Sequence, residues 1–337
     1  MPEMNSYSEI AELLNHRLVF VMGKGGAGKT TLATALAFAA EASGKRVLLT
    51  ETVENMAIGR LFGKPEIDEK PVPVSRHISI ARILPKVEMA EYTQFHIKSG
   101  FIAKQITNSR LFDNLAGAVP GLNEIMTLGR LWRWESARRE NGKPFYDTII
   151  VDSPATGHAL DLLRLPGMLI DMIRVGPIVS QVKNLHLLLR DRTRTALVLV
   201  SPPEELPVKE SVELIRIARD DLGIPVSMFF ANAVCPDIFP SSQNELLNDI
   251  LFSDQSDRLS GVVSNPDVVD DVLKAARHQY LWRQIHEKNI DYVRNVVTCP
   301  VVEMPFYAIS DMTLHDIREM AKDCFFPATV TRGAVDV

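Results

Sequence analysis

The sequence predicts a doubly wound α/β protein with a mainly parallel β-sheet and an inserted helical subdomain. Several short runs are nearly continuous in apolar residues, as strands covered on both faces are. Segments with helical periodicity separate most of these runs, which favours parallel strands joined by helical crossovers. A glycine-rich segment, GKGGAGKTT at residues 23–31, follows the first run and precedes a predicted helix.

The predicted strands are distributed along most of the chain. The first is expected at residues 17–22 (RLVFVM), and the helix after the glycine-rich segment closes at Gly44. Residues 77–85 alternate apolar and polar side chains, which is typical of an edge strand. Further apolar runs predict strands at residues 46–51, 147–152, 195–201, 225–234 and 300–306.

We expect residues 1–337 to form a single domain. Helical periodicity without strong strands places a helical insertion at about 86–141, and a second helical stretch spans about 166–191. The tail, 328–337, is expected to fray.

Two of these helical segments leave alternatives open. RLWRWESARRE (130–140) fits either a helix with Leu131 and Trp134 inward and its arginines in water, or a nucleic-acid patch; we favour the helix. Met168 and Met172 fit either core or a client groove, with core slightly favoured.

Composition excludes several classes of protein. The net charge of −5 provides no overall positive field for nucleic acid, and the 46% hydrophobic content supports a large core. The three cysteines form no C-x-x-C pair, so neither a disulfide framework nor a zinc site is expected. Without a signal peptide or a spanning run, the sequence predicts a cytoplasmic protein with no direct membrane insertion, which would act on membranes only through partners.

The glycine-rich segment satisfies the phosphate-binding pattern G-x-x-x-x-G-K-[ST] between a strand and a helix. Glycines let successive backbone N–H groups surround a β-phosphate, and the helix N-terminus adds its positive dipole end. Lys29 would neutralise the β- and γ-phosphates, and Thr30 would ligate Mg²⁺. The expected nucleotide-binding residues here are Gly23, Gly25, Gly26, Ala27, Gly28, Lys29, Thr30 and Thr31.

Lys24 makes this loop unusual. K-G-G-x-G-K-T resembles the deviant form found in the MinD/ParA/ArsA group of ATPases. In that group the early lysine reaches across a two-fold interface to the partner's nucleotide. The resemblance therefore implies that Lys24 is a catalytic residue and that the protein is a dimer, either a homodimer or a heterodimer with a paralogue. The alternative for Lys24 is an ordinary solvated lysine.

A second segment, FYDTIIVDSPATGHALDLLRLP at residues 145–166, is similar to the block shared by ArsA arsenite-pump ATPases and the tail-anchored-protein targeting ATPase. A carboxylate that ends a strand beside a phosphate-binding loop is placed to hold the Mg²⁺ shell, which assigns that role to Asp152. The resemblance implies that Thr156 and Gly157 sense the γ-phosphate. We expect His158 to be a packing or switch residue rather than a base.

The resemblance continues through residues 201–234, which end near Asn232, the counterpart of an adenine-contacting asparagine. Pro305 and Phe306 fall where the family's second adenine-contacting loop begins. The chain lacks the N-K-x-D pattern of GTPases at this place, so ATP is favoured over GTP.

The chain departs from the family after the second strand. ArsA-type enzymes carry T-D-P-A-H there, with an aspartate that orients the attacking water, whereas Val53 occupies that position here. Glu51 and Glu54 are the candidate replacements; the alternatives are a strand-end carboxylate that only supports the Mg²⁺ shell and a solvated loop charge. Because water positioning supplies much of the rate in phosphoryl transfer, we expect slow or partner-dependent hydrolysis.

The C-x-x-C zinc clasp of the family is missing. The spacing of Cys235, Cys299 and Cys324 does not reproduce the arsenite-binding cysteine cluster either, and the sequence leaves open a cluster formed only in the fold. With one phosphate-binding loop, the chain most resembles the single-domain bacterial members. The resemblance implies an ATPase switch using ATP and Mg²⁺ that couples its state to a client or a membrane-protein partner. The alternatives are a non-hydrolysing regulatory subunit paired with a paralogue, and a ParA- or MinD-like positioning factor, against which the T-G-H switch and the acidic balance argue.

Overall fold

The computed structural model describes residues 3–52, 56–96, 121–172, 177–237, 251 and 266–326. Its centre is an eight-stranded sheet with the order β3-β4-β2-β5-β1-β6-β7-β8. Seven strands are parallel, and only β3 pairs in the antiparallel sense. This confirms the predicted doubly wound, mainly parallel α/β fold.

The predicted apolar runs are the strands of this sheet, with ends shifted by a residue or two. They are β1 (Leu18–Met22), β2 (Val47–Thr52), β4 (Ile78–Ile83), β5 (Thr148–Asp152), β6 (Thr195–Ser201), β7 (Val226–Val234) and β8 (Val301–Pro305). The expectation of an edge strand at residues 77–85 is wrong, because the short strand β3 (Val72–Pro73) covers β4 from outside. Its proline is tolerated because an edge strand has one side free of ladder hydrogen bonds.

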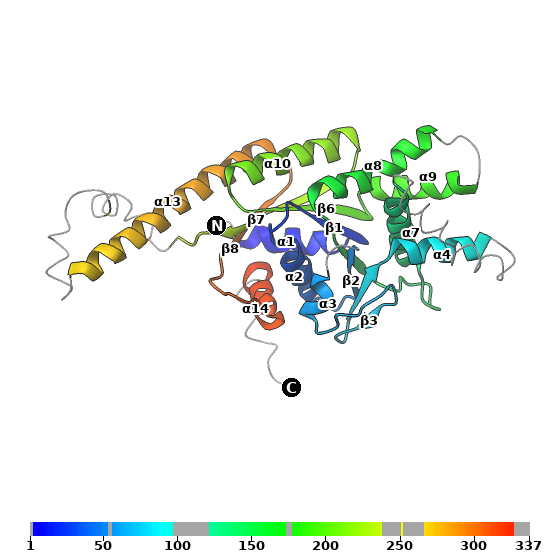
Figure 1. Cartoon of the computed structure of the whole chain (residues 1–337), viewed down its shortest axis with the longest axis horizontal. Coiled ribbons are helices and arrows are strands. Elements are labelled where there is room, and N and C mark those ends of the chain that lie inside the picture. The colour runs from blue at the N-terminus through cyan, green and yellow to red at the C-terminus, as the bar shows by residue number, and fades with distance from the viewer. Residues whose placement is uncertain are drawn as a thin grey trace.

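The sheet separates two apolar cores, and the alternation of side chains along β1 shows why. Leu18, Phe20 and Met22 belong to one core, whereas Val19 and Val21 belong to the other. Helices cover both faces (Figure 1). The first core is closed by α7 (Leu122–Ser136), α8 (Thr156–Met172), α9 (Pro177–Arg190) and α10 (Glu205–Arg216). The second is closed by α1 (Glu3–Leu13), α2 (Lys29–Ala42), α3 (Ala57–Leu61) and α14 (Leu314–Phe325).

Two helices fall within the predicted insertion, α4 (Pro85–His96) and α7, while residues 97–120 between them lie outside the described part of the chain. The second predicted helical stretch holds the end of α8 and all of α9. Residues 328–337 also lie outside the described part. The domain boundaries themselves stay predictions.

The helix α7 corrects one expectation. Leu131 and Trp134 are buried as predicted, but Arg130, expected in water, is only 9% exposed. Its guanidinium is paired with carboxylates from another helix, which is what permits its burial.

The helix α8 corrects another. Met168 and Met172 are 57% and 76% exposed, so the favoured core interpretation is wrong for both. Leu169 and Ile170, between them, do pack against the core, which accounts for the apolar pattern in the sequence.

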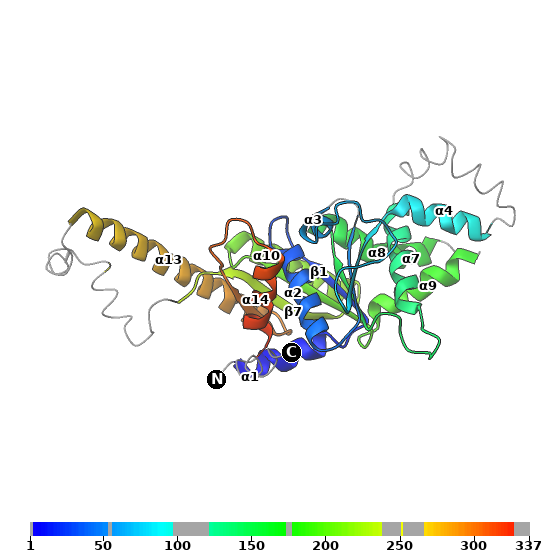
Figure 2. The ribbon, with the colours of Figure 1, turned by 90° about the horizontal axis from the view of Figure 1, so that it is seen from below.

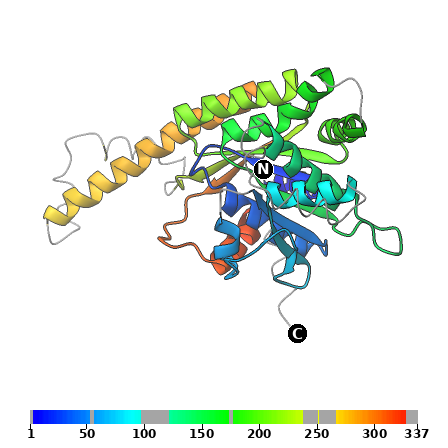
Figure 3. The same ribbon diagram turned by 45° about the vertical axis from the view of Figure 1, so that its right-hand side comes forward.

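The longest described helix is α13 (Pro266–Val296), which the sequence analysis did not predict. Its C-terminal turns pack on the first core through Ile290 and Val293, and its N-terminal half projects away from the sheet (Figures 1 and 3). The helix α4 lies at the opposite end of the molecule (Figure 2). Among the described residues, no helix combines the length and the apolar character that a membrane crossing requires.

Candidate nucleotide site

The phosphate-binding loop joins β1 to α2 at the carboxyl end of the sheet, between the neighbouring strands β5 and β6. Gly28 precedes α2 with a φ of 94°, in the left-handed region that favours glycine. A Cβ at this position would lie 2.2 Å from Nδ2 of Asn232, so the backbone there also needs the space. The turn demanded by the sequence pattern is therefore formed, with α2 starting at Lys29.

No side chain of the described residues caps the N-terminus of α2. The first N–H groups of a helix have no intrahelical acceptor, and the helix dipole makes this end attractive to anions. Lys29 and Thr30 open the helix, and Thr31 completes its first three positions. This end of α2 is thus suited to phosphate oxygens.

Asp152, the last residue of β5, approaches the same helix. The hydroxyl of Thr30 donates a hydrogen bond to its Oδ2 at 2.6 Å. Asp152 is only 2% exposed, and its Oδ1 is buried with no partner among the described residues. Burial raises the pKa of this carboxyl from 3.8 to about 6, although Thr30 and Lys29 lower it. A buried, unpartnered carboxylate oxygen beside a hydroxyl is the donor set that Mg²⁺ prefers, so the residues fit the ion.

Lys29 is 9% exposed, and its ammonium donates to the backbone carbonyl of Lys24 at 3.1 Å. Burial lowers its pKa, while the nearby charge of Asp152 raises it. The side chain is thus folded over its own loop, as a lysine that contacts phosphates from that loop would need to be.

Lys24 points elsewhere in this structure. Its ammonium pairs with Glu210 of α10 at 2.9 Å, and both side chains are 49% exposed. Such exposed pairs are worth roughly 0–1 kcal/mol, so this contact opens at little cost. Glu210 had not been singled out in the sequence, because 186 positions separate the two residues.

Glu51 lies fully buried on β2, beside Asp152 on β5 and Arg82 on β4. Its Oε1 accepts from Nε of Arg82 at 3.1 Å, and its Oε2 accepts from the backbone N–H of Ile58 at 2.9 Å. Burial raises the pKa of Glu51, and the two hydrogen bonds oppose that change. Both oxygens are engaged, so the geometry favours a structural role that holds the start of α3, and a role in orienting water stays a prediction.

The remaining members of this predicted catalytic group cannot be placed. Val53 and Glu54 fall in residues 53–55, outside the described part of the chain. The departure from the family pattern at Val53 and the proposed rescue by Glu54 therefore stay predictions.

The segment after Asp152 leads directly into α8, which begins at Thr156. The side chain of Thr156 lies outside the described part, while Gly157 and His158 are exposed. Ser153 was missed in the sequence: its hydroxyl is buried and finds no partner among the described residues. Its position directly after Asp152 was the available signal.

Asn232, near the end of β7, lies on the side of the loop opposite to Asp152 and donates from Nδ2 to the carbonyl of Ala27 at 2.9 Å. A register shift between β7 and β8 falls between Ala231 and Val234, and Ala233 has a φ of 59°. This bulge re-aims the side chain of Asn232, as bulges beside functional sites commonly do.

The predicted second adenine-contacting loop is close to this bulge. Pro305 ends β8, and Phe306, with its side chain 56% exposed, donates its backbone N–H to the carbonyl of Val234 at 2.8 Å. The structure therefore brings Asn232, Pro305 and Phe306 to the same edge of the sheet.

Comparison with known proteins agrees with this geometry. The sequence profile of the anion-transporting ATPase family matches residues 16–186. The chain belongs to this family. It is accordingly an ATPase, and the matched residues include the phosphate-binding loop, Asp152 and the segment that leads into α8.

Relatives of this anion-transporting ATPase occur in distant organisms. It is 27% identical over 300 residues to ATPase BagA of Mycobacterium tuberculosis, covering 86% of this chain and 87% of that protein. It is 27% identical over 198 residues to ATPase GET3 of Kluyveromyces lactis, covering 53% of this chain and 55% of that protein. It is 32% identical over 153 residues to ATPase ASNA1 homolog 1 of Paramecium tetraurelia, covering 45% and 44% of the two chains.

A cavity of about 450 Å³ lies beside the phosphate end of this ATPase. One side of it is formed by Thr52, the last residue of β2, and by Pro154, two residues beyond the end of β5. Helices α4, α7 and α8 form the other side. His158 and Leu162 line it from α8. The segments expected to respond to the γ-phosphate thus lie against the helices of the predicted insertion.

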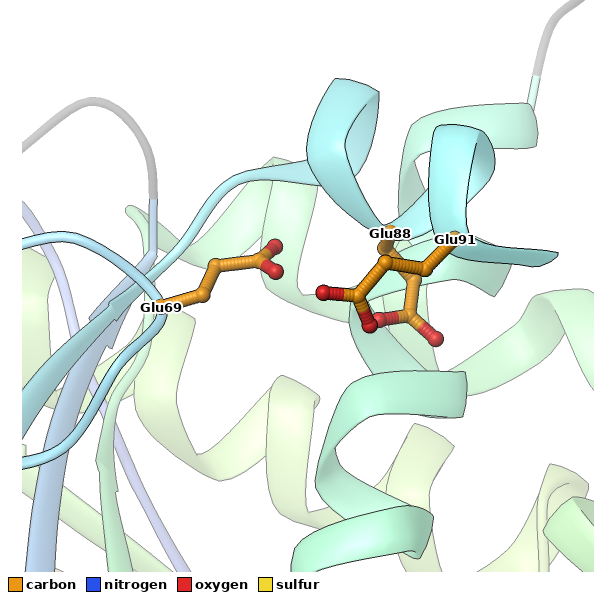
Figure 4. Close-up of side chains that lie close together, drawn as sticks. All are labelled: Glu69, Glu88 and Glu91. Atoms are coloured by element: carbon orange, nitrogen blue, oxygen red, sulfur yellow. The ribbon is translucent and has the colours of Figure 1, made fainter. Parts of the chain in front are cut away.

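Three carboxylates face one another near this cavity, from Glu69 before β3 and from Glu88 and Glu91 on α4 (Figure 4). They are the one group of potential metal ligands in the described part of the chain. Two guanidinium groups of α7 already compensate them: Arg130 lies 2.8 Å from Glu88 and 3.0 Å from Glu91, and Arg133 lies 2.9 Å from Glu91. We interpret the group as an ion-pair network that fastens α4 to α7.

Proposed function

We propose that this ATPase is a dimeric, Mg²⁺-ATP-dependent switch that couples its nucleotide state to binding of a client or a membrane-protein partner, with slow or partner-dependent hydrolysis. One observation carries the proposal. The complete phosphate-binding loop meets Asp152, whose Oδ1 is buried with no partner among the described residues and whose Oδ2 accepts a hydrogen bond from Thr30.

The chain's own residues divide the work of binding. Backbone N–H groups of the loop and the N-terminus of α2 would hold the phosphates, with Lys29 compensating their charge. Thr30 and Asp152 would hold Mg²⁺, which neutralises charge that develops on the phosphate oxygens when it is bound. Thr156 and Gly157 would report the γ-phosphate, and Asn232, Pro305 and Phe306 would contact the base.

Lys24 supports the dimer. Its exposed pair with Glu210 leaves the ammonium near the loop but not committed to a buried partner. We infer that this pair opens when a second protomer, identical or paralogous, approaches, and that Lys24 then contacts the partner's nucleotide. A resting pair worth so little does not prevent this exchange.

Slow turnover is supported by Glu51. A general base or water-positioning carboxylate needs a free oxygen within hydrogen-bond reach of the water. Each oxygen of Glu51 already accepts a hydrogen bond, from Arg82 or from Ile58, and the side chain is fully buried, so neither oxygen is exposed to water. Glu54 is then the better candidate for the vacant role.

Coupling to a client is supported by the position of α8. Its first residues line the cavity beside the phosphate end, while its last residues expose Met168 and Met172. Flexible methionines suit apolar surfaces that accept varied partners. A single helix that begins beside the phosphate-binding loop and ends in such a surface provides a path between the two.

The deciding experiment measures ATP turnover and Mg²⁺-ATP affinity for the wild type, Glu51→Gln, Glu54→Gln and Val53→Asp. We expect slow turnover by the wild type, lost in Glu54→Gln without loss of affinity and accelerated in Val53→Asp. Turnover per protomer should rise with protein concentration, and Lys24→Ala should remove that rise. Concentration-independent turnover that is insensitive to Lys24→Ala would contradict the homodimeric switch.

A further inference from the structure

The helix α13 holds both backbone polar groups of one residue, Cys235, beyond the end of β7. The backbone N–H of Cys235 donates to Nδ1 of His286 at 3.0 Å, and the carbonyl of Cys235 accepts from Arg283 at 3.2 Å. His286 and Arg283 are three positions apart on α13 and therefore share one face of the helix. Both backbone polar groups of Cys235 are thus bonded to the same helix.

The clasped residue directly follows the bulge that carries Asn232. Ala233 is the one non-glycine residue with positive φ in the described part of the chain, a conformation that costs free energy unless its surroundings fix it. On one side, Phe306 of the segment after β8 bonds the carbonyl of Val234 at 2.8 Å. On the other side, α13 bonds Cys235. The bulge is therefore held between the neighbouring strand and this helix.

The orientation of Asn232 is what this arrangement preserves. Its Nδ2 donates to the carbonyl of Ala27, so the amide nitrogen must face the loop and Oδ1 is the group left to accept from a ligand. An acceptor matches the exocyclic amino group of adenine and opposes the carbonyl of guanine at the same place. The selectivity of the base site thus depends on which way this amide is held.

The imidazole is suited to the task. His286 is 7% exposed and packs edge-on against Trp282, with ring centroids 5.5 Å apart. Because Nδ1 accepts from an N–H group, the ring is neutral with its proton on Nε2. Arg283, the second member of the clasp, is itself fixed by Glu287 at 2.8 Å and Glu303 at 3.4 Å.

We propose that His286 and Arg283 are positioning residues for base recognition: through the backbone of Cys235, α13 fixes the β7 bulge that aims Asn232 and so sets the preference for adenine. This inference rests on the base-contacting role proposed above for Asn232. Neither residue needs to touch the nucleotide.

The test compares His286→Leu, which removes the acceptor, with His286→Asn, whose Oδ1 restores an acceptor near the position of Nδ1. His278→Leu, an exposed histidine on the same helix, is the matched control. Calorimetry would measure the binding of Mg²⁺-ADP, Mg²⁺-GDP and inorganic pyrophosphate to each full-length protein. Melting temperatures would confirm that the variants are folded.

We expect His286→Leu to weaken ADP binding about tenfold, the equivalent of one hydrogen bond, while pyrophosphate binding stays within about twofold. The preference for ADP over GDP should fall in the same variant, and His286→Asn should restore it. His278→Leu should match the wild type.

Two results would overturn the inference: unchanged ADP binding in His286→Leu, or ADP and pyrophosphate binding that weaken in the same proportion. Asn232→Ala separates failure of this inference from failure of the proposed function. If Asn232→Ala retains the full preference for ADP over GDP, the proposed base contact is wrong, whatever the variants of α13 show.

Discussion

Replacing Asp152 by asparagine should make the metal-free protein more stable while removing its response to Mg²⁺. Burial raises the pKa of Asp152 from 3.8 to about 6, so the folded chain binds a proton more tightly than the unfolded chain does. This gap of about two pH units corresponds to about 3 kcal/mol, by which the ionised carboxylate destabilises the metal-free fold at neutral pH.

The sign follows from proton binding. The folded protein holds the extra proton between about pH 4 and pH 6, so the free energy of unfolding falls as the pH rises through this window and stays low above it. Asparagine does not titrate, and its oxygen can still accept from Thr30. Its N–H₂ group lies where Oδ1 had no partner, at a cost of about 1–3 kcal/mol, which leaves a net gain of at most about 2 kcal/mol.

The assay is urea unfolding at pH 4, 6 and 7.5 without nucleotide, then at pH 7.5 with Mg²⁺-ADP. Asp152→Asn should exceed the wild type at pH 7.5, lose that advantage at pH 4, and gain little from Mg²⁺-ADP, since a ligand stabilises only the fold that binds it. Asp161→Asn removes an equal charge from the exposed face of α8 and should change stability by less than about 0.5 kcal/mol. A variant less stable than the wild type at pH 7.5, with a difference independent of pH, would refute the reasoning.

Three further substitutions test other contacts. Glu210→Gln frees Lys24 from its own chain and should leave the melting temperature unchanged while raising turnover at low protein concentration; turnover as low as that of Lys24→Ala would contradict the exchange. Gly28→Ala should abolish nucleotide binding, and in urea unfolding its cost should partly disappear when Asn232→Ala is added, because the new Cβ would meet that side chain. Glu69→Gln should be more favourable to the free energy of unfolding at pH 8 than at pH 5, because burial raises the pKa of Glu69 to about 7; an effect of the same size at both pH values would contradict the cause.

The sheet and the phosphate-binding loop were predictable because their physics is local. A strand buried on both faces is predominantly apolar, and β1, β2, β5 and β6 are buried at every position, with their charged residues at the carboxyl ends beside the site. The loop needs glycine where φ is positive, and Gly26 and Gly28 show such angles at 79° and 94°. The pairing of Thr30 with Asp152 followed from the parallel topology, which brings the carboxyl ends of β1 and β5 together.

The rest depended on contacts between distant residues. Arg130 is buried because it pairs with the carboxylates of Glu69 and Glu88, which lie dozens of positions away in the sequence. No local sequence pattern indicates such a pairing. The helix α13 escaped prediction because much of it lacks an apolar stripe facing a core: Leu281, Trp282 and Ile285 are all more than 40% exposed. Its clasp on Cys235 pairs side chains with a backbone unit, which sequence patterns do not record.

Two buried polar groups without hydrogen-bond partners in the described chain suggest how a bound nucleotide could affect α8. Oδ1 of Asp152 and the hydroxyl of Ser153 are buried without partners in the described chain, at the point where β5 leads into α8. A ligand that satisfies them is worth more to the closed arrangement of this segment than to any opened one, because an unpaired buried group costs about 1–3 kcal/mol. We therefore expect nucleotide and metal to stabilise the start of α8, and a change in the γ-phosphate to alter how firmly that helix is held. If that proposal holds, ATP and ADP forms should differ at the elements packed against α8, namely the cavity with α4 and α7 and the exposed methionines at the far end of the helix.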